Sequence, residues 1–164
     1  MYGYGAPEDS SDDAMEQPLC WPNKAFDRSP SELLWVEGDS WGPLKGSLLN
    51  LSYGYGKVYI VPHEKIGDTW QGGMCRLPLP SFPTGVMRAR FHPTNGQMYA
   101  CGMNAWGSNQ TERPGGLYRI RYTGAETLLP IGLEAKESGM TLRFTQPVDS
   151  ESARDPKNYL VDIW

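Results

Sequence analysis

The stretch GVMRARFHPTNGQMYACGMNAW, residues 85–106, contains the clearest structural signal in this chain. Its first half alternates apolar and basic side chains, which is the period-two pattern of a β-strand with two different faces. Asn95 and Gly96 follow, and both residue types tolerate the positive backbone angles that a tight hairpin turn requires. Residues 97–103 then form the returning strand. The stretch therefore predicts an antiparallel β-hairpin.

Strand signals continue on both sides of this hairpin. Upstream, SLLNLSYG (47–54) and KVYIVP (57–62) predict two strands that are joined at a glycine-rich turn. A shorter strand is predicted before them, in LLWVEGD (33–39). Downstream, LYRIRYTG (117–124) alternates apolar side chains with arginines. Because no segment keeps a helical period over three turns, we expect an all-β fold.

A six-residue pattern recurs among these predicted strands. It is GSLLNL from Gly46, GGMCRL from Gly72 and GGLYRI from Gly115. The later two copies start 43 residues apart, a spacing typical of β-propeller blades, whereas the earlier two start only 26 residues apart. One copy is therefore degenerate, or the match is accidental. Since a propeller needs about four to eight blades of four strands, we expect residues 19–128 to form a partial β-propeller of about two to three blades.

The composition changes after Pro130. IGLEAKESGMTLRFTQPVD (131–149) predicts a strand, a Ser-Gly turn and a second strand. SESARDP (150–156) predicts a turn or one helical turn, and NYLVDIW (158–164) predicts a third strand. This order is how an immunoglobulin-like β-sandwich begins, and such a domain has about seven strands. We therefore expect residues 129–164 to be an incomplete β-sandwich and the whole chain to be part of a larger protein.

Charge and cysteine content exclude several classes of protein. Residues 1–18 hold five acids between positions 8 and 16 and predict a flexible acidic arm. The remainder is close to neutral, which gives no electrostatic reason to expect nucleic-acid binding. No apolar run reaches the roughly 18–20 residues of a membrane span. Cys20, Cys75 and Cys101 contain no CxxC pair, which leaves open one disulfide with a spare thiol or three free thiols.

Basic residues at alternate positions supply the candidate binding site. Arg88, Arg90 and His92 recur at every second position and so share one face of a strand. Arg119 and Arg121 are spaced in the same way on a strand that we expect nearby. Guanidinium groups hold carboxylates through paired hydrogen bonds, so the first three residues are candidate cofactor-binding residues. The alternative is a solvated face whose arginine stems cover apolar surface.

Catalytic and metal-binding residues are not identified by any motif. His92 also fits a simpler role, in which it makes one backbone hydrogen bond in the turn before Pro93. No loop carboxylate has the spaced partners of a calcium loop, so no metal ligand is predicted. Six tryptophans and nine tyrosines are many for 164 residues. Exposed aromatic planes stack on sugars or form interfaces, whereas buried ones would fill the space between propeller blades.

Residues from about 19 to 164 resemble the secreted sorbosone- and glucose-dehydrogenase-like β-propeller proteins, often named membrane-bound dehydrogenases in planctomycete- and verrucomicrobium-type genomes. The segments that carry the resemblance are 38–61, QGGMCRLPL (71–79), 84–106, GGLYRIRYTG (115–124) and 148–164. The resemblance implies a quinone-dependent sugar or alcohol dehydrogenase that works in the periplasm or outside the cell. It implies pyrroloquinoline quinone and calcium as cofactors of the complete protein.

The same resemblance implies partners that this chain lacks. They are the remaining propeller blades and a cytochrome c domain. Because half a propeller cannot enclose a central channel, we expect the isolated chain to be inactive. Neither His63 nor His92 matches the family's catalytic histidine by motif. The second hypothesis is a non-catalytic propeller scaffold that binds carbohydrate or an electron-transfer partner.

Overall fold

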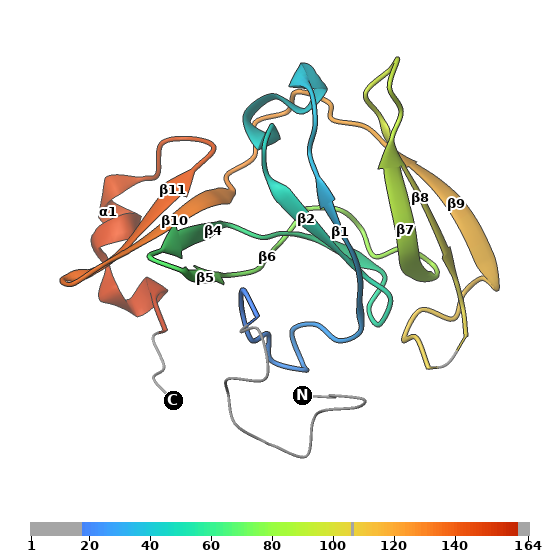
Figure 1. The fold of residues 1–164 in the computed structure, drawn as a ribbon, viewed down its shortest axis with the longest axis horizontal. Helices are drawn as coiled ribbons and strands as arrows, with labels where there is room; N and C mark the ends of the chain where they lie inside the picture. Colours follow the sequence, from blue (N-terminus) through green and yellow to red (C-terminus); the bar gives the residue numbers. More distant parts are fainter. Residues whose placement is uncertain (1–17, 106, 161–164) are drawn as a thin grey trace.

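The computed structural model describes residues 18–105 and 107–160. Within these residues the chain consists mainly of antiparallel strands in four separate sheets, none of which is closed (Figure 1). The predicted all-β class is therefore confirmed. The predicted acidic arm lies outside the described residues, apart from Pro18. Among the described residues, no helix has the length and apolar character that a bilayer span requires.

The first sheet has four strands in the order β1-β2-β3-β6. They are β1 (Pro30–Trp35), β2 (Leu48–Ser52), β3 (Lys57–Ile60) and β6 (Cys75–Arg76). The predicted hairpin between β2 and β3 is present, with its turn at residues 54–56. A second hairpin, β4 (His63–Ile66) with β5 (Thr69–Gly72), interrupts the path from β3 to β6. The sequence pattern did not predict this hairpin, because its short strands are mostly polar.

The second sheet contains the hairpin that residues 85–106 predict. Its strands are β7 (Gly85–Phe91), β8 (Met98–Met103) and β9 (Gly115–Ile120), in that order. Gly96 adopts φ 65°, as the turn requires. A β-bulge between Val86 and Arg88 shifts the register of β7 against β8. The bulge bends the strand where it lies beside β1.

The two large sheets pack face to face, and the hydrophobic core lies between them. Strands β1 and β2 contact β7 directly. Figure 1 shows these strands as neighbouring layers. The core side chains come from both sheets and from the short 3-10 helix Asp39–Leu44; they include Leu49, Leu51, Val58, Ile60, Val86, Met98, Ala100 and Ile120. Trp41 closes one end of this layer, where its indole N–H donates to the carbonyl of Gly96 at 2.8 Å.

Residues 129–160 contain the predicted hairpin and helical turn, but not the predicted last strand. Strands β10 (Pro130–Lys136) and β11 (Gly139–Phe144) form the expected hairpin, and α1 (Ser150–Arg154) is the expected helical turn. The predicted strand 158–164 is wrong over 158–160, where a 3-10 turn, Pro156–Asn158, is followed by irregular chain. Asp155 caps that turn and Pro156 starts it, a combination that favours helical geometry. Residues 161–164 lie outside the described residues.

The three copies of the six-residue pattern do not occupy equivalent places. GSLLNL covers the second strand of the first sheet, GGMCRL the fourth, and GGLYRI the third strand of the second sheet. Repeated blades would place equal sequences on equal strands. The pattern therefore records a common strand chemistry and not a structural repeat.

We predict that Gly102→Ala destabilises the second sheet. A Cβ at this position would lie 1.8 Å from the carbonyl oxygen of Gly85 and 2.6 Å from the hydroxyl of Thr84. Neither atom can retreat without breaking the β7–β8 pairing, so we expect a loss of about 3 kcal/mol in the free energy of unfolding. Gly115→Ala, on the neighbouring strand, is the control, because its nearest contact is 3.6 Å. Equal urea midpoints for the two variants would contradict this packing.

Candidate functional site

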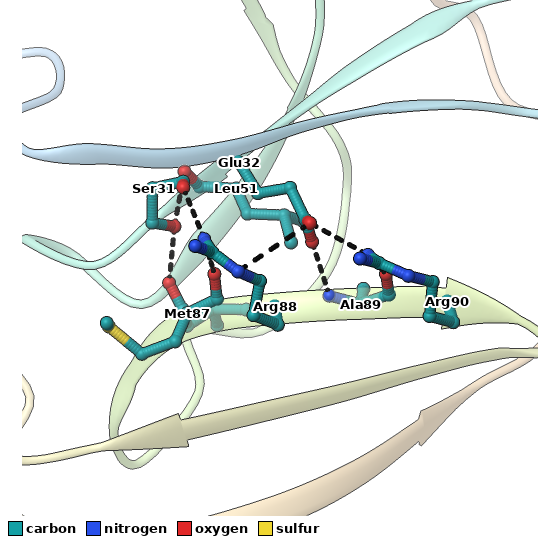
Figure 2. A network of polar contacts seen from close by, with 8 residues as sticks. Ser31, Glu32, Leu51, Met87, Arg88, Ala89 and Arg90 are labelled. Atoms are coloured by element: carbon teal, nitrogen blue, oxygen red, sulfur yellow. Dashed lines mark hydrogen bonds and ion pairs between the residues drawn. The ribbon is translucent and has the colours of Figure 1, made fainter.

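The two large sheets meet at their edge strands, β1 and β7 (Figure 2). Ser31 on β1 donates from its hydroxyl to the carbonyl of Val86 at 2.6 Å. In return, the guanidinium of Arg88 donates to the carbonyl of Ser31 at 2.8 Å. Backbone groups that an open edge would leave to solvent are thus satisfied by side chains of the opposite sheet.

Glu32 is the centre of this contact. Only 13% of its side chain is exposed. One carboxylate oxygen accepts from the backbone N–H of Ala89 at 2.7 Å, and the other accepts from Arg90 at 2.7 Å. The Nε of Arg88 lies 3.8 Å from the second oxygen. Figure 2 shows the carboxylate between the two arginines. The hydrogen bond to Glu32 raises the pKa of Arg90 above its usual value.

The three predicted binding residues, Arg88, Arg90 and His92, do not share one set of contacts. Arg88 and Arg90 hold a carboxylate, as their chemistry suggests, but it is a carboxylate of the same chain. His92 lies just beyond the end of β7, where its Nδ1 accepts from the backbone N–H groups of Thr94 and Asn95 at 3.2 and 3.4 Å. It therefore makes the backbone contacts that the simpler interpretation describes.

The two further arginines of the sequence pattern lie on or after β9. Arg119 pairs with Tyr99 of β8, which in turn pairs with Arg90 of β7. One strand therefore separates the two arginines on the same face of the second sheet. Arg121 follows the end of β9 and lines a different pocket. The basic residues of the two strands do not converge on one point.

A groove of about 340 Å³ lies beside the Glu32 contact. Its walls come from β1, from the residues that follow it and from the end of β7: Glu32, Leu33, Leu34, Trp35, Glu37, Arg90 and Phe91. Leu33 and Trp35 are large apolar side chains that are about half exposed, at 57% and 49%. The groove thus combines an exposed indole with carboxylate and guanidinium groups.

Trp35 also belongs to a row of three rings, which we call the aromatic strip: Trp35, His63 and Trp70. Their centroids are 5.4 Å apart between Trp35 and His63 and 5.8 Å apart between His63 and Trp70. Trp70 is 49% exposed, as is Trp35. The Nδ1 of His63 lies 2.8 Å from the carbonyl oxygen of Val61. A carbonyl can only accept, so Nδ1 is the donor, and Nε2 of the neutral ring is left as an acceptor.

A second polar centre lies on the face of the first sheet that is turned away from the second. Asp27 is 2% exposed and accepts from the hydroxyl of Ser52 at 2.5 Å. Burial raises the pKa of Asp27. Burial, together with the charge of Asp27, raises the pKa of Tyr59 well above its usual range, and the hydroxyl of Tyr59 donates to the carbonyl of Phe26 at 3.0 Å. These contacts fasten residues 23–29 to the sheet.

The quinone cofactor that the resemblance implies carries carboxylates and needs cationic partners. Arg88 and Arg90 do not fit that role as they lie here, because Glu32 holds both of them and would repel a second carboxylate. Over residues 18–105 and 107–160, no three His, Cys, Asp or Glu side chains are grouped as metal ligands. All three cysteines are free thiols.

Comparison of the chain with protein-family models, with curated proteins and with solved structures finds no match. Sequence reasoning missed Glu32 and the aromatic strip, because their members are brought together from β1, β4, β5 and β7. The exposed tryptophans could have been suspected only from the high tryptophan count.

We predict that Glu32→Ala lowers the free energy of unfolding by about 1–2 kcal/mol, because it removes the acceptor for Ala89 N–H and the partner of two arginines. The arginines are largely exposed, so solvent reduces the effect. Glu32→Gln keeps an acceptor for Ala89 and should lose less. Glu37→Ala, an exposed acid of the same groove, should change stability by less than about 0.5 kcal/mol. Urea unfolding that ranks Glu32→Ala with Glu37→Ala would contradict this role.

We predict that Asp27→Asn changes the pH dependence of stability. The folded protein holds the Asp27 proton more tightly than the unfolded chain, so the contribution of Asp27 is greatest at acid pH. That contribution falls as pH rises above the unfolded value, near 3.9, through the raised folded pKa. The variant should therefore gain stability relative to the native protein as pH rises from 3 to 7.

Asp39→Asn is the control for this pH series. Asp39 is exposed, and its hydrogen bond and ion pair with Lys45 lower its pKa. Its stabilising effect is therefore present at neutral pH and is lost on acidification, which is the opposite sign. Urea unfolding between pH 3 and 8 measures both variants. A constant difference between Asp27→Asn and the native protein would contradict the buried, proton-retaining carboxyl.

Proposed function

We propose that the two large sheets are neighbouring blades of a β-propeller and that β10 and β11 begin a β-sandwich. Three features support this proposal. The first sheet is four-stranded and antiparallel, as a propeller blade is. The second sheet packs against its face, and the edge strands β1 and β7 lie side by side, as the innermost strands of adjacent blades do. Since a propeller has about four to eight blades, further blades would have to complete the ring that these two sheets begin.

We propose that the function of this part of the ring is to bind carbohydrate, as a non-catalytic scaffold. The aromatic strip is the observation that carries the proposal. Two tryptophans, each about half exposed, flank a histidine and form an exposed aromatic surface. The C–H faces of a sugar ring pack on such planes with little loss of side-chain freedom, because an aromatic residue has only two rotatable bonds.

Polar groups around the strip would supply the hydrogen bonds that a sugar needs. The His63 ring lies beside both indoles, and its Nε2, which the contact of Nδ1 with Val61 leaves free, would accept from a sugar hydroxyl. On the other side of Trp35, the groove offers Glu37 as an acceptor and Arg90 as a donor. Trp35 is shared by both features, so a chain of sugar units would contact first the groove and then the strip.

The dehydrogenase hypothesis stays a prediction for the complete protein, together with its extracytoplasmic location and its cytochrome partner. It needs a cofactor cradle that Arg88, Arg90 and His92 do not form as they lie here. Its cofactors would then have to be held by residues of other blades. The scaffold hypothesis needs no such addition, and for this reason we favour it.

We predict that the chain binds at least one soluble polysaccharide from a panel of neutral and acidic glycans, measured by isothermal titration calorimetry. Trp35→Ala and Trp70→Ala should each weaken binding about five- to tenfold, equivalent to about 1–1.4 kcal/mol. Tyr159→Ala is the control, because this ring is similarly exposed, at 55%, but lines a different pocket, beside α1, that contains no residue of the strip.

Equal losses for Trp35→Ala, Trp70→Ala and Tyr159→Ala, or no binding across the panel, would overturn the carbohydrate proposal. A further arm separates the two hypotheses. If the complete protein oxidises an aldose with an artificial electron acceptor only after pyrroloquinoline quinone and calcium are added, then the dehydrogenase hypothesis replaces the scaffold.

A further inference from the structure

A pocket separate from the aromatic strip lies where the first and second sheets meet the β10–β11 hairpin. Its volume is about 270 Å³. Four chain segments line it: the 3-10 helix at Trp41, the chain after β6, the connection from β9 to β10, and the chain after β11. Its walls are Trp41, Pro43, Leu44, Leu77, Pro78, Leu79, Ile120, Arg121, Tyr122, Thr123, Ala125, Thr127, Leu129, Thr145 and Gln146.

The inner wall of the pocket is apolar and rigid. Trp41, Leu44 and Leu77 are each less than 5% exposed and belong to the hydrophobic core. The Tyr122 ring stacks on Trp41 with a centroid distance of 6.5 Å and an interplanar angle of 24°. Gly42 allows this arrangement, since a Cβ there would lie 3.0 Å from the Tyr122 ring. Packing on Trp41 therefore fixes the Tyr122 ring, which stays partly exposed, as the aromatic wall of the pocket.

The hydroxyl groups of the pocket are largely used by the protein itself. The Thr145 hydroxyl accepts from the N–H of Leu129 at 3.0 Å and donates to the carbonyl of Thr127. The Thr127 hydroxyl donates to the carbonyl of Ala125 at 3.3 Å. These bonds hold the β9–β10 connection against the chain after β11, so the pocket keeps its shape without a ligand. They also leave few polar groups to fix a polar ligand deep inside.

The charge at the pocket is positive and comes from one residue. Of the lining residues, Arg121 alone carries a charge at neutral pH, and it is exposed at the rim beside Thr123 and Ala125. An apolar cavity of about 150 Å³ accepts benzene, so a pocket of about 270 Å³ suits a ring system that is one ring larger. A guanidinium at the mouth pairs with a carboxylate in two parallel hydrogen bonds.

We propose that this pocket is a binding site for a small aromatic carboxylate of about two fused rings. The rings would lie on Tyr122, beside Leu79, and the carboxylate would meet Arg121 at the rim. This site is independent of the carbohydrate proposal, because it shares no residue with the aromatic strip.

The probe for this proposal is 1-naphthoate, with 1-naphthamide as its uncharged counterpart, and both are titrated into the full chain by calorimetry. We expect saturable binding of 1-naphthoate to one site. Arg121→Gln should weaken 1-naphthoate about tenfold and leave 1-naphthamide unchanged. Arg119→Gln is the matched control, because this exposed arginine lies two residues away and does not line the pocket, so its binding should equal that of the native protein.

Ala125→Trp tests the location without disturbing the core, since Ala125 is exposed at the rim. It should abolish the binding of both probes while the thermal unfolding midpoint stays within a few degrees of the native value. Trp35→Ala should bind 1-naphthoate normally, which separates this site from the sugar site. The proposal is overturned if neither probe binds saturably, if Arg119→Gln weakens binding as much as Arg121→Gln, or if folded Ala125→Trp binds like the native protein.

Discussion

The first and second sheets hold their fold by covering each other's apolar faces. Neither sheet is wide, and each is stable only while its apolar face is covered. Side chains such as Leu49 and Leu51 on β2, and Met98 and Ala100 on β8, are withdrawn from water only by the opposite sheet. Trp41 closes the end of this layer. It couples the core to the hairpin turn through Gly96, so one side chain both fills space and fixes a loop.

This packing creates a problem at the edges, because β1 and β7 approach each other without pairing as strands. The carboxylate of Glu32 bridges the two edges, because it accepts from the backbone N–H of Ala89 on β7 and forms ion pairs with Arg88 and Arg90. The arginine pair thus has a structural explanation that needs no ligand. The same geometry leaves the farther half of β1 open, and there Leu33 and Trp35 remain exposed beside the groove.

The opposite face of the first sheet is covered in a different way. Asp27 and Phe26 cover its middle strands, where Asp27 bonds Ser52 and the Phe26 ring lies 5.3 Å from Tyr59. The cover does not extend to the edge at Trp35. The β4–β5 hairpin adds His63 and Trp70 beside that edge, and Glu64 joins the hairpin to β10 through the N–H of Ala135 at 2.6 Å. The aromatic strip is therefore carried by strands β1, β4 and β5.

The sequence alone determined the local elements. Alternation along β7, the Asn95-Gly96 turn, the glycine turn between β2 and β3 and the Ser-Gly turn before β11 depend on neighbouring residues, so they could be predicted from them. The β4–β5 hairpin was missed because its strands lack apolar alternation. A strand was wrongly predicted at Asn158, because Asp155 caps a 3-10 turn there. The pairing of Glu32 with Arg90 and the contact of Trp35 with His63 could not be predicted in this way. These partners are far apart in the chain, and which of them meet is set by how whole sheets pack.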